Sequence, residues 1–155
     1  MIKTALVDHK ITEHLIKILS NLELKNEGLP PNSTCTINGF QTDNLCYEPY
    51  IKDELEKLLE YLPNKDLKYR WFHMINYKNH GYQDAHEHSK TEDYSYILYL
   101  TDCNEGGETL FINGEESVAI KPEKNKLVFF PANLWHKGNP TIDNKKVAVG
   151  ALVVK

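Results

Sequence analysis

A change in hydrophobic periodicity near Lys68 constrains the fold of this chain more than any other feature. Before it, apolar residues recur at helical spacing in two segments, residues 9–20 and 51–62. After it, about eight short runs rich in β-branched and aromatic residues follow one another, and Gly, Asn, Asp or Pro separates most of them. Strands without helices between them favour antiparallel pairing. We therefore expect a mainly β (α+β) fold, a double-stranded β-helix or jelly roll with N-terminal supporting helices.

The length of 155 residues suits a single domain. Residues 1–68 are predicted to be a helical support region, and residues 69–154 the jelly-roll core. Residues 27–50 are rich in Gly, Pro, Asn, Ser and Thr, which predicts a long irregular connection with room for one short strand. The predicted core strands are residues 69–77, 83–89, 94–101, 108–112, 117–120, 126–130, 134–137 and 146–154.

Charge and composition exclude several classes of protein. A net charge of -4 disfavours a nucleic-acid partner, and three cysteines without CxxC spacing disfavour a disulfide framework or a thiolate zinc site. No apolar run reaches the roughly 18 residues of a membrane span. The first residues lack the long apolar stretch of a secretory signal. We expect a soluble, cytoplasmic protein, a monomer or weak homodimer, with no nucleic acid or membrane as a partner.

The histidines point to a metal. Three of the seven fall within residues 79–88. His86 and His88 are two residues apart, so in an extended strand both rings project to one face, which Asp84 shares by parity. His136 follows about fifty residues later at a predicted strand end, where it could complete a facial set of ligands. Imidazole suits iron, zinc, copper or nickel, and a facial triad with open positions is typical of non-haem Fe(II) oxygenases.

The last predicted strand offers a candidate ligand-binding face. Lys146, Ala148 and Gly150 share one side of it because alternate residues point the same way. We interpret the small residues beside an inward lysine as room for a ligand.

Several motifs in the second half occur in the order and spacing of a known family. Residues 69–154 resemble the 2-oxoglutarate- and Fe(II)-dependent oxygenases, especially the small prolyl 4-hydroxylase-like and phage-type members. The motifs are Tyr77 and Gly81, His86-Glu87-His88, Ile97-Leu98-Tyr99-Leu100-Thr101-Asp102, Gly106-Gly107-Glu108-Thr109-Leu110-Phe111, Val128-Phe129-Phe130-Pro131, His136, and Lys146 ten residues further on.

The resemblance implies roles for particular residues. His86, His88 and His136 would bind Fe(II), and Lys146 would pair with the distal carboxylate of 2-oxoglutarate. Tyr99 would hydrogen-bond the same carboxylate, and Tyr77 and Thr109 would line the pocket. No residue is assigned a separate catalytic role. The implied cofactors are Fe(II), 2-oxoglutarate and O2, with ascorbate as a candidate addition, and the implied reaction hydroxylates a C–H bond of a peptidyl substrate, prolyl among them, or of a small molecule.

His88 departs from the family pattern, which has Asp at this position. Three neutral imidazoles leave the metal its full charge, and a shifted set in which Asp84 supplies a carboxylate remains open. Two other functions also remain open. One is a three-histidine, cupin-like dioxygenase that does not use 2-oxoglutarate; the other is a non-catalytic jelly-roll module that binds a metal or ligand.

Overall fold

The computed structural model describes residues 1–26 and 36–155; residues 27–35, within the predicted connection, lie outside it. The elements, in chain order, are β1 (Lys3–Leu6), α1 (His9–Ser20), β2 (Lys25–Asn26), β3 (Thr36–Gln41), the 3-10 turn η1 (Pro49–Ile51), α2 (Lys52–Leu59), β4 (Leu67–His86), β5 (Tyr94–Tyr99), β6 (Thr109–Asn113), β7 (Glu116–Ile120), β8 (Lys126–Pro131), β9 (Trp135–Gly138) and β10 (Lys145–Val154).

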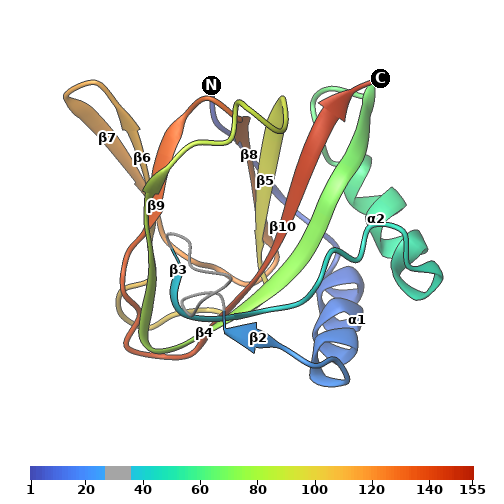
Figure 1. Cartoon of the computed structure of the whole chain (residues 1–155), viewed down its shortest axis with the longest axis horizontal. Helices are drawn as coiled ribbons and strands as arrows, with labels where there is room; N and C mark the ends of the chain where they lie inside the picture. The colour runs from blue at the N-terminus through green and yellow to red at the C-terminus, as the bar shows by residue number, and fades with distance from the viewer. Residues whose placement is uncertain (27–35) are drawn as a thin grey trace.

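The strands form one curled antiparallel sheet in the order β1-β8-β5-β10-β4-β9-β6-β7, with β3 also paired to β4 and β2 to β3. Figure 1 shows how the sheet curls, so that β6, β7 and β9 lie on the opposite side of the roll from β5, β8 and β10. The predicted fold class is confirmed: the chain is mostly β, a jelly roll with two short helices. The sequence did not predict β1, which pairs with β8 at the sheet edge.

The long strand β4 makes the curl. The sequence predicted two strands here, residues 69–77 and 83–89, whereas the structure has one strand whose first part pairs with β10 and whose end pairs with β9. The bend falls at Asn79 and His80, which have positive φ angles of 49° and 63°. Gly81 follows, and a Cβ there would lie 2.6 Å from the Asn38 carbonyl oxygen. The bend carries one strand from one side of the roll to the other (Figure 1).

Both helices cover the outer face of the β4–β10–β5 region (Figure 1). Helix α1 spans the predicted residues 9–20, and the Asp8 side chain caps it by accepting from the Lys10 N–H at 2.9 Å. The second predicted helix, residues 51–62, is shortened to α2, because its N-terminal end belongs to the 3-10 turn and residues 60–61 form a turn. The apolar faces of both helices join one core with the outer face of the sheet. Its fully buried members include Leu15, Leu58, Phe72, Met74, Leu98 and Leu152.

Strand β10 alternates between this outer core and the inside of the roll. Ala148 lies in the outer core, and Gly150 packs against the ring of Tyr96. Val147 lies in the second core, inside the curl, with Ile75, Tyr77 and Tyr99. The interpretation that Ala148 and Gly150 leave room for a ligand is therefore wrong. These residues are small because the Tyr96 ring and the helix layer occupy the space beside them.

Gly150→Ala is expected to destabilise the fold by about 1 to 3 kcal/mol, the usual cost of overpacking a core. A Cβ at this position would lie 2.3 Å from Tyr96 Cε2, and Tyr96 is fully buried and cannot swing away. Chemical denaturation measures the change. Gly138→Ala is the matched strand control, because its Cβ would meet Gln83 Cβ at an ordinary 3.6 Å. Equal losses of stability in both variants would contradict this account of Gly150.

None of the helices in the described part of the chain is both long enough and apolar enough to span a membrane.

Candidate metal and cosubstrate site

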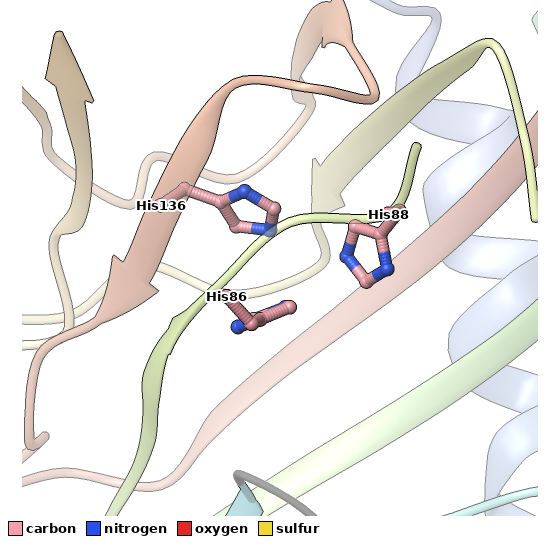
Figure 2. A group of neighbouring side chains, drawn as sticks. All are labelled: His86, His88 and His136. Atoms are coloured by element: carbon pink, nitrogen blue, oxygen red, sulfur yellow. The ribbon is translucent and has the colours of Figure 1, made fainter. Parts of the chain in front are cut away.

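Three histidines meet on the inside of the roll. His86 ends β4 and lies directly opposite His136 of β9 in the antiparallel register. His88 follows two residues later, where its N–H donates to the Ala132 carbonyl at 2.8 Å. The ring centroid of His86 lies 4.3 Å from that of His136 and 4.6 Å from that of His88. One nitrogen atom from each of the three rings lies within 4.8 Å of the other two. Figure 2 shows the three rings converging, His86 from the end of β4, His136 from β9 and His88 from the segment that follows β4.

Backbone contacts orient two of these rings. His86 Nδ1 lies 2.7 Å from the Asp84 carbonyl oxygen, and His136 Nδ1 lies 3.0 Å from that of Leu134. A carbonyl only accepts hydrogen bonds, so each Nδ1 carries the proton and each Nε2 keeps a free lone pair. This is the arrangement that a metal-binding histidine needs. The Asp84 side chain is exposed, and the cluster of donors within metal-binding reach does not include it.

Burial keeps these imidazoles neutral. It lowers the pKa of His136 to about 3 and the pKa of His88 to about 4, and it also lowers the pKa of His86. For His136 the apolar surroundings are the rings of Phe130 and Phe111, whose centroids lie 4.8 and 5.9 Å away. Neutral imidazole is the form that binds metals, so at neutral pH the donors need lose no proton.

A small, mainly apolar cavity of about 30 Å³ adjoins His136. Its lining residues come from five strands and are Tyr77, Gln83, Ile97, Thr109, His136, Gly138, Lys145, Val147 and Val149. Lys145 is the cation in this cavity. Its side chain is buried, Nζ donates to the Gly107 carbonyl at 3.0 Å, and Nζ also lies 4.7 Å from the centre of the Tyr77 ring. Burial lowers the pKa of Lys145 to about 8.

The predicted residues Tyr77, Thr109 and Tyr99 gather around this cavity. Tyr77 and Thr109 line it, and Tyr99 lies one hydrogen bond further away, with its hydroxyl donating to Thr109 Oγ1 at 2.6 Å. All three side chains are buried. Because Thr109 Oγ1 accepts from Tyr99, the hydroxyl hydrogen of Thr109 is free to donate to an acceptor in the cavity.

The prediction that the Lys146 side chain faces the site is wrong, and Lys145 takes that position. β10 begins at Lys145, which pairs with Tyr77, so the inner face carries residues 145, 147 and 149. The opposite parity places Lys146 on the face of Ala148 and Gly150. The backbone N–H of Lys146 donates to Thr101 Oγ1 at 3.0 Å. A spacing of ten residues from His136 does not determine parity when a turn lies between the two strands.

Three residues at or beside the site were not predicted to have a role there. Lys145 was excluded only by its assumed parity. Glu92 is a buried carboxylate near His88, and nothing in its local sequence distinguishes it from a loop glutamate. His73 has the parity of Ile75 and Tyr77 on β4, and burial, followed by the charge of His88, lowers its pKa to about 4. Counting alternate residues back from Tyr77 would have placed His73 on the inner face.

The donor set and the cavity fit a particular chemistry. Three imidazole nitrogens with open positions suit a mononuclear iron or similar divalent ion. A buried ammonium a short distance away suits an anionic cosubstrate, because a charge this far from water needs an ionic partner. The fold and the site therefore define a jelly-roll protein with three histidines that could hold a metal ion and a buried lysine in the adjoining cavity.

Comparison with known families names this class. The family model of the 2OG-Fe(II) oxygenase superfamily matches residues 70–152, more than half of the chain. The chain belongs to this superfamily, and it is a 2-oxoglutarate- and Fe(II)-dependent oxygenase. The cupin-like dioxygenase and the non-catalytic module are not favoured. A comparison with curated protein sequences finds no significant match.

Solved structures share the fold. The viral collagen prolyl hydroxylase from Paramecium bursaria Chlorella virus-1, in its 2-oxoglutarate complex, matches with a TM-score of 0.69 and 20% identity over 97% of this chain and 94% of that chain. HygX from Streptomyces hygroscopicus, with nickel, 2-oxoglutarate and hygromycin B bound, matches with a TM-score of 0.75 and 9% identity over 100% and 82%. A Trichoplax adhaerens prolyl hydroxylase in complex with a hypoxia-inducible-factor peptide matches with a TM-score of 0.71 and 12% identity over 97% and 83%.

Proposed function

We propose that this oxygenase hydroxylates a C–H bond of a peptidyl substrate, prolyl among them, or of a small molecule, with Fe(II) bound by His86, His88 and His136. Lys145 binds the distal carboxylate of 2-oxoglutarate. The observation that carries this proposal is the buried ammonium of Lys145 in the same cavity as His136. The proteins of similar structure include a collagen prolyl hydroxylase, a prolyl hydroxylase in complex with a peptide, and one with hygromycin B bound.

The side chains divide the work between them. The three imidazoles hold the metal, which activates O2 when bound, while 2-oxoglutarate supplies two electrons and becomes succinate and carbon dioxide. Lys145 neutralises the incoming carboxylate, which competes with the Gly107 carbonyl for the ammonium protons. The Thr109 hydroxyl, held by Tyr99, is placed to donate to the same carboxylate. The Tyr77 ring stabilises the ammonium through a cation–π contact.

An anaerobic absorption experiment tests the proposal. Purified protein is mixed with Fe(II), with 2-oxoglutarate, and with both. We expect a metal-to-ligand absorption band that appears only when both Fe(II) and 2-oxoglutarate are present. Succinate should then form when O2 is admitted. Iron binding without that band would favour the cupin-like enzyme, and the absence of iron binding would favour the non-catalytic module. Prolyl peptides and small molecules are then compared by their gain of one oxygen atom in mass spectra.

Cosubstrate affinity is expected to fall as the pH rises above about 8. In the free enzyme the pKa of Lys145 is about 8, so below this value the side chain is an ammonium, and above it the side chain is a neutral amine. Since the carboxylate pairs with the ammonium, the binding constant should decrease roughly tenfold per pH unit above the pKa. Titrations of 2-oxoglutarate between about pH 7 and 9.5 measure the slope.

Lys145→Arg is the control for this pH dependence, because a guanidinium stays charged over the whole range. Its affinity should remain flat even if its absolute value is lower. Parallel curves for the wild type and this variant would contradict the assignment of the slope to Lys145.

A further inference from the structure

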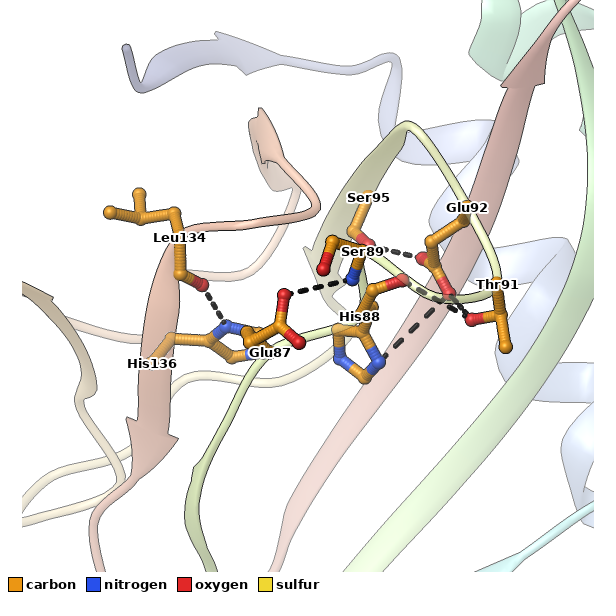
Figure 3. A network of polar contacts seen from close by, with 8 residues as sticks. All are labelled: Glu87, His88, Ser89, Thr91, Glu92, Ser95, Leu134 and His136. Atoms are coloured by element: carbon orange, nitrogen blue, oxygen red, sulfur yellow. Dashed lines mark hydrogen bonds and ion pairs between the residues drawn. The ribbon is translucent and has the colours of Figure 1, made fainter.

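The three histidines differ in the partner of their Nδ1 atoms. Those of His86 and His136 face backbone carbonyls, whereas that of His88 faces a carboxylate oxygen, Glu92 Oε1, at 3.9 Å. Figure 3 shows the His88 ring between Glu92 on one side and His136 on the other. The two nitrogens of the His88 ring lie on opposite edges of the ring. The Glu92 carboxylate faces Nδ1, on the edge away from His136. Glu92 is therefore placed to act through His88 rather than as a ligand.

Glu92 is fixed in position. Its side chain is only 6% exposed, Oε2 accepts from the Ser95 hydroxyl, and Oε1 accepts from the Thr91 hydroxyl at 3.2 Å. Its backbone N–H donates to the His88 carbonyl at 3.2 Å, which closes the turn that joins the two residues. Burial raises the pKa of Glu92, whereas the two hydroxyls and Arg70 oppose this rise. A bound divalent cation would oppose it further.

We propose that Glu92 is a positioning residue for His88. The Glu92 carboxylate accepts a hydrogen bond from His88 Nδ1–H and supplies the negative charge that a site of three imidazoles lacks. This inference rests on the proposed iron site. The family pattern has a carboxylate ligand where this chain has His88. Glu92 therefore restores the missing negative charge from behind the His88 ring instead of by direct contact with the metal. The 3.9 Å separation is longer than a hydrogen bond. Coordination at Nε2 makes Nδ1–H a stronger donor, and a small tilt of the ring would close the contact.

Glu92→Gln tests the role of the charge. The amide keeps the size of the side chain and can still accept from Ser95 and Thr91, but it carries no charge. We expect the dissociation constant for Fe(II), measured anaerobically without 2-oxoglutarate, to rise about 10- to 100-fold, as it does when outer-shell partners of metal ligands are changed. Glu92→Asp should recover part of the affinity. Asp93→Asn is the matched control, since it removes a charge from the same turn at an exposed position and should change affinity less than about twofold.

A double-mutant cycle separates this role from a purely structural one. In a His88→Asp background the metal already has a carboxylate ligand and there is no imidazole to orient, so Glu92→Gln should change affinity less than about threefold. Equal losses in both backgrounds would mean that Glu92 only stabilises the turn, which would overturn the proposal. An unchanged affinity in the single variant would also overturn it.

Spectroscopy provides a readout that turn stability alone would not change. In the Co(II)-substituted protein, each Nδ1–H should give its own paramagnetically shifted proton signal. Glu92→Gln should move the His88 signal and speed its exchange with solvent, and leave those of His86 and His136 in place. If the wild-type protein binds no divalent metal, the proposed function itself fails; if it binds metal and the His88 signal does not respond to Glu92→Gln, only the role of Glu92 fails.

Discussion

His136→Ala is expected to weaken Fe(II) binding by more than about 100-fold, because changes to outer-shell partners alone typically cost 10- to 100-fold. His136 is the most enclosed of the three histidines, with Phe111 and Phe130 beside it and its Nδ1 held by the Leu134 carbonyl. Anaerobic titration with Fe(II), or with Co(II) as a redox-stable substitute, measures the loss.

His73→Gln is the control for this experiment. His73 lies on β4, and burial and the charge of His88 lower its pKa, but it is not a member of the cluster of donors. Its replacement should leave metal affinity within about threefold of the wild type. A loss comparable to that of His136→Ala would mean that the metal lies deeper in the roll and uses a different set of histidines. Thermal unfolding of both metal-free variants checks that they remain folded.

Lys145→Met should raise the dissociation constant for 2-oxoglutarate about 10- to 150-fold and leave Fe(II) affinity nearly unchanged. A charge-assisted hydrogen bond to a desolvated carboxylate contributes about 1.5 to 3 kcal/mol, and each 1.4 kcal/mol corresponds to a factor of ten. Methionine fills a similar volume, so the cavity wall is preserved while the charge is lost. Anaerobic titration of the iron-loaded protein with 2-oxoglutarate, followed by its absorption band, gives the constants.

Lys146→Met provides the comparison, since it removes the same charge from the next residue of the same strand. The face of Lys146 is the one that meets Tyr96 and the helix layer, so its replacement should change cosubstrate affinity less than about twofold. A larger effect for Lys146→Met than for Lys145→Met would return the cosubstrate anchor to the position that the sequence predicted. Equal effects would mean that neither side chain contacts the carboxylate.

Local patterns were sufficient to predict most elements of the fold. The helix at residues 9–20 was predictable because its apolar spacing is regular and Asp8 stands at the N-cap. The later strands were predictable because turn residues separate them. The continuity of β4 was not predictable, because residues 78–82 look like a turn in sequence. In the structure they are a bend that β3 supports by pairing on both sides of it.

The sequence by itself predicted that His86 and His88 would lie together, from the period of two in an extended strand, although β4 ends at His86 and His88 lies in the segment that follows it. It also determined that this chain would fold as a jelly roll, through the series of short strands after Lys68. Only the tertiary structure decided which lysine enters the cavity, because the parity of β10 is set by Tyr96 packing against Gly150 and by the pairing of Lys145 with Tyr77. Only the tertiary structure placed Glu92 behind His88. This contact depends on a turn closed by backbone hydrogen bonds and on the burial of Glu92 against Ser95. No sequence pattern predicts either of these.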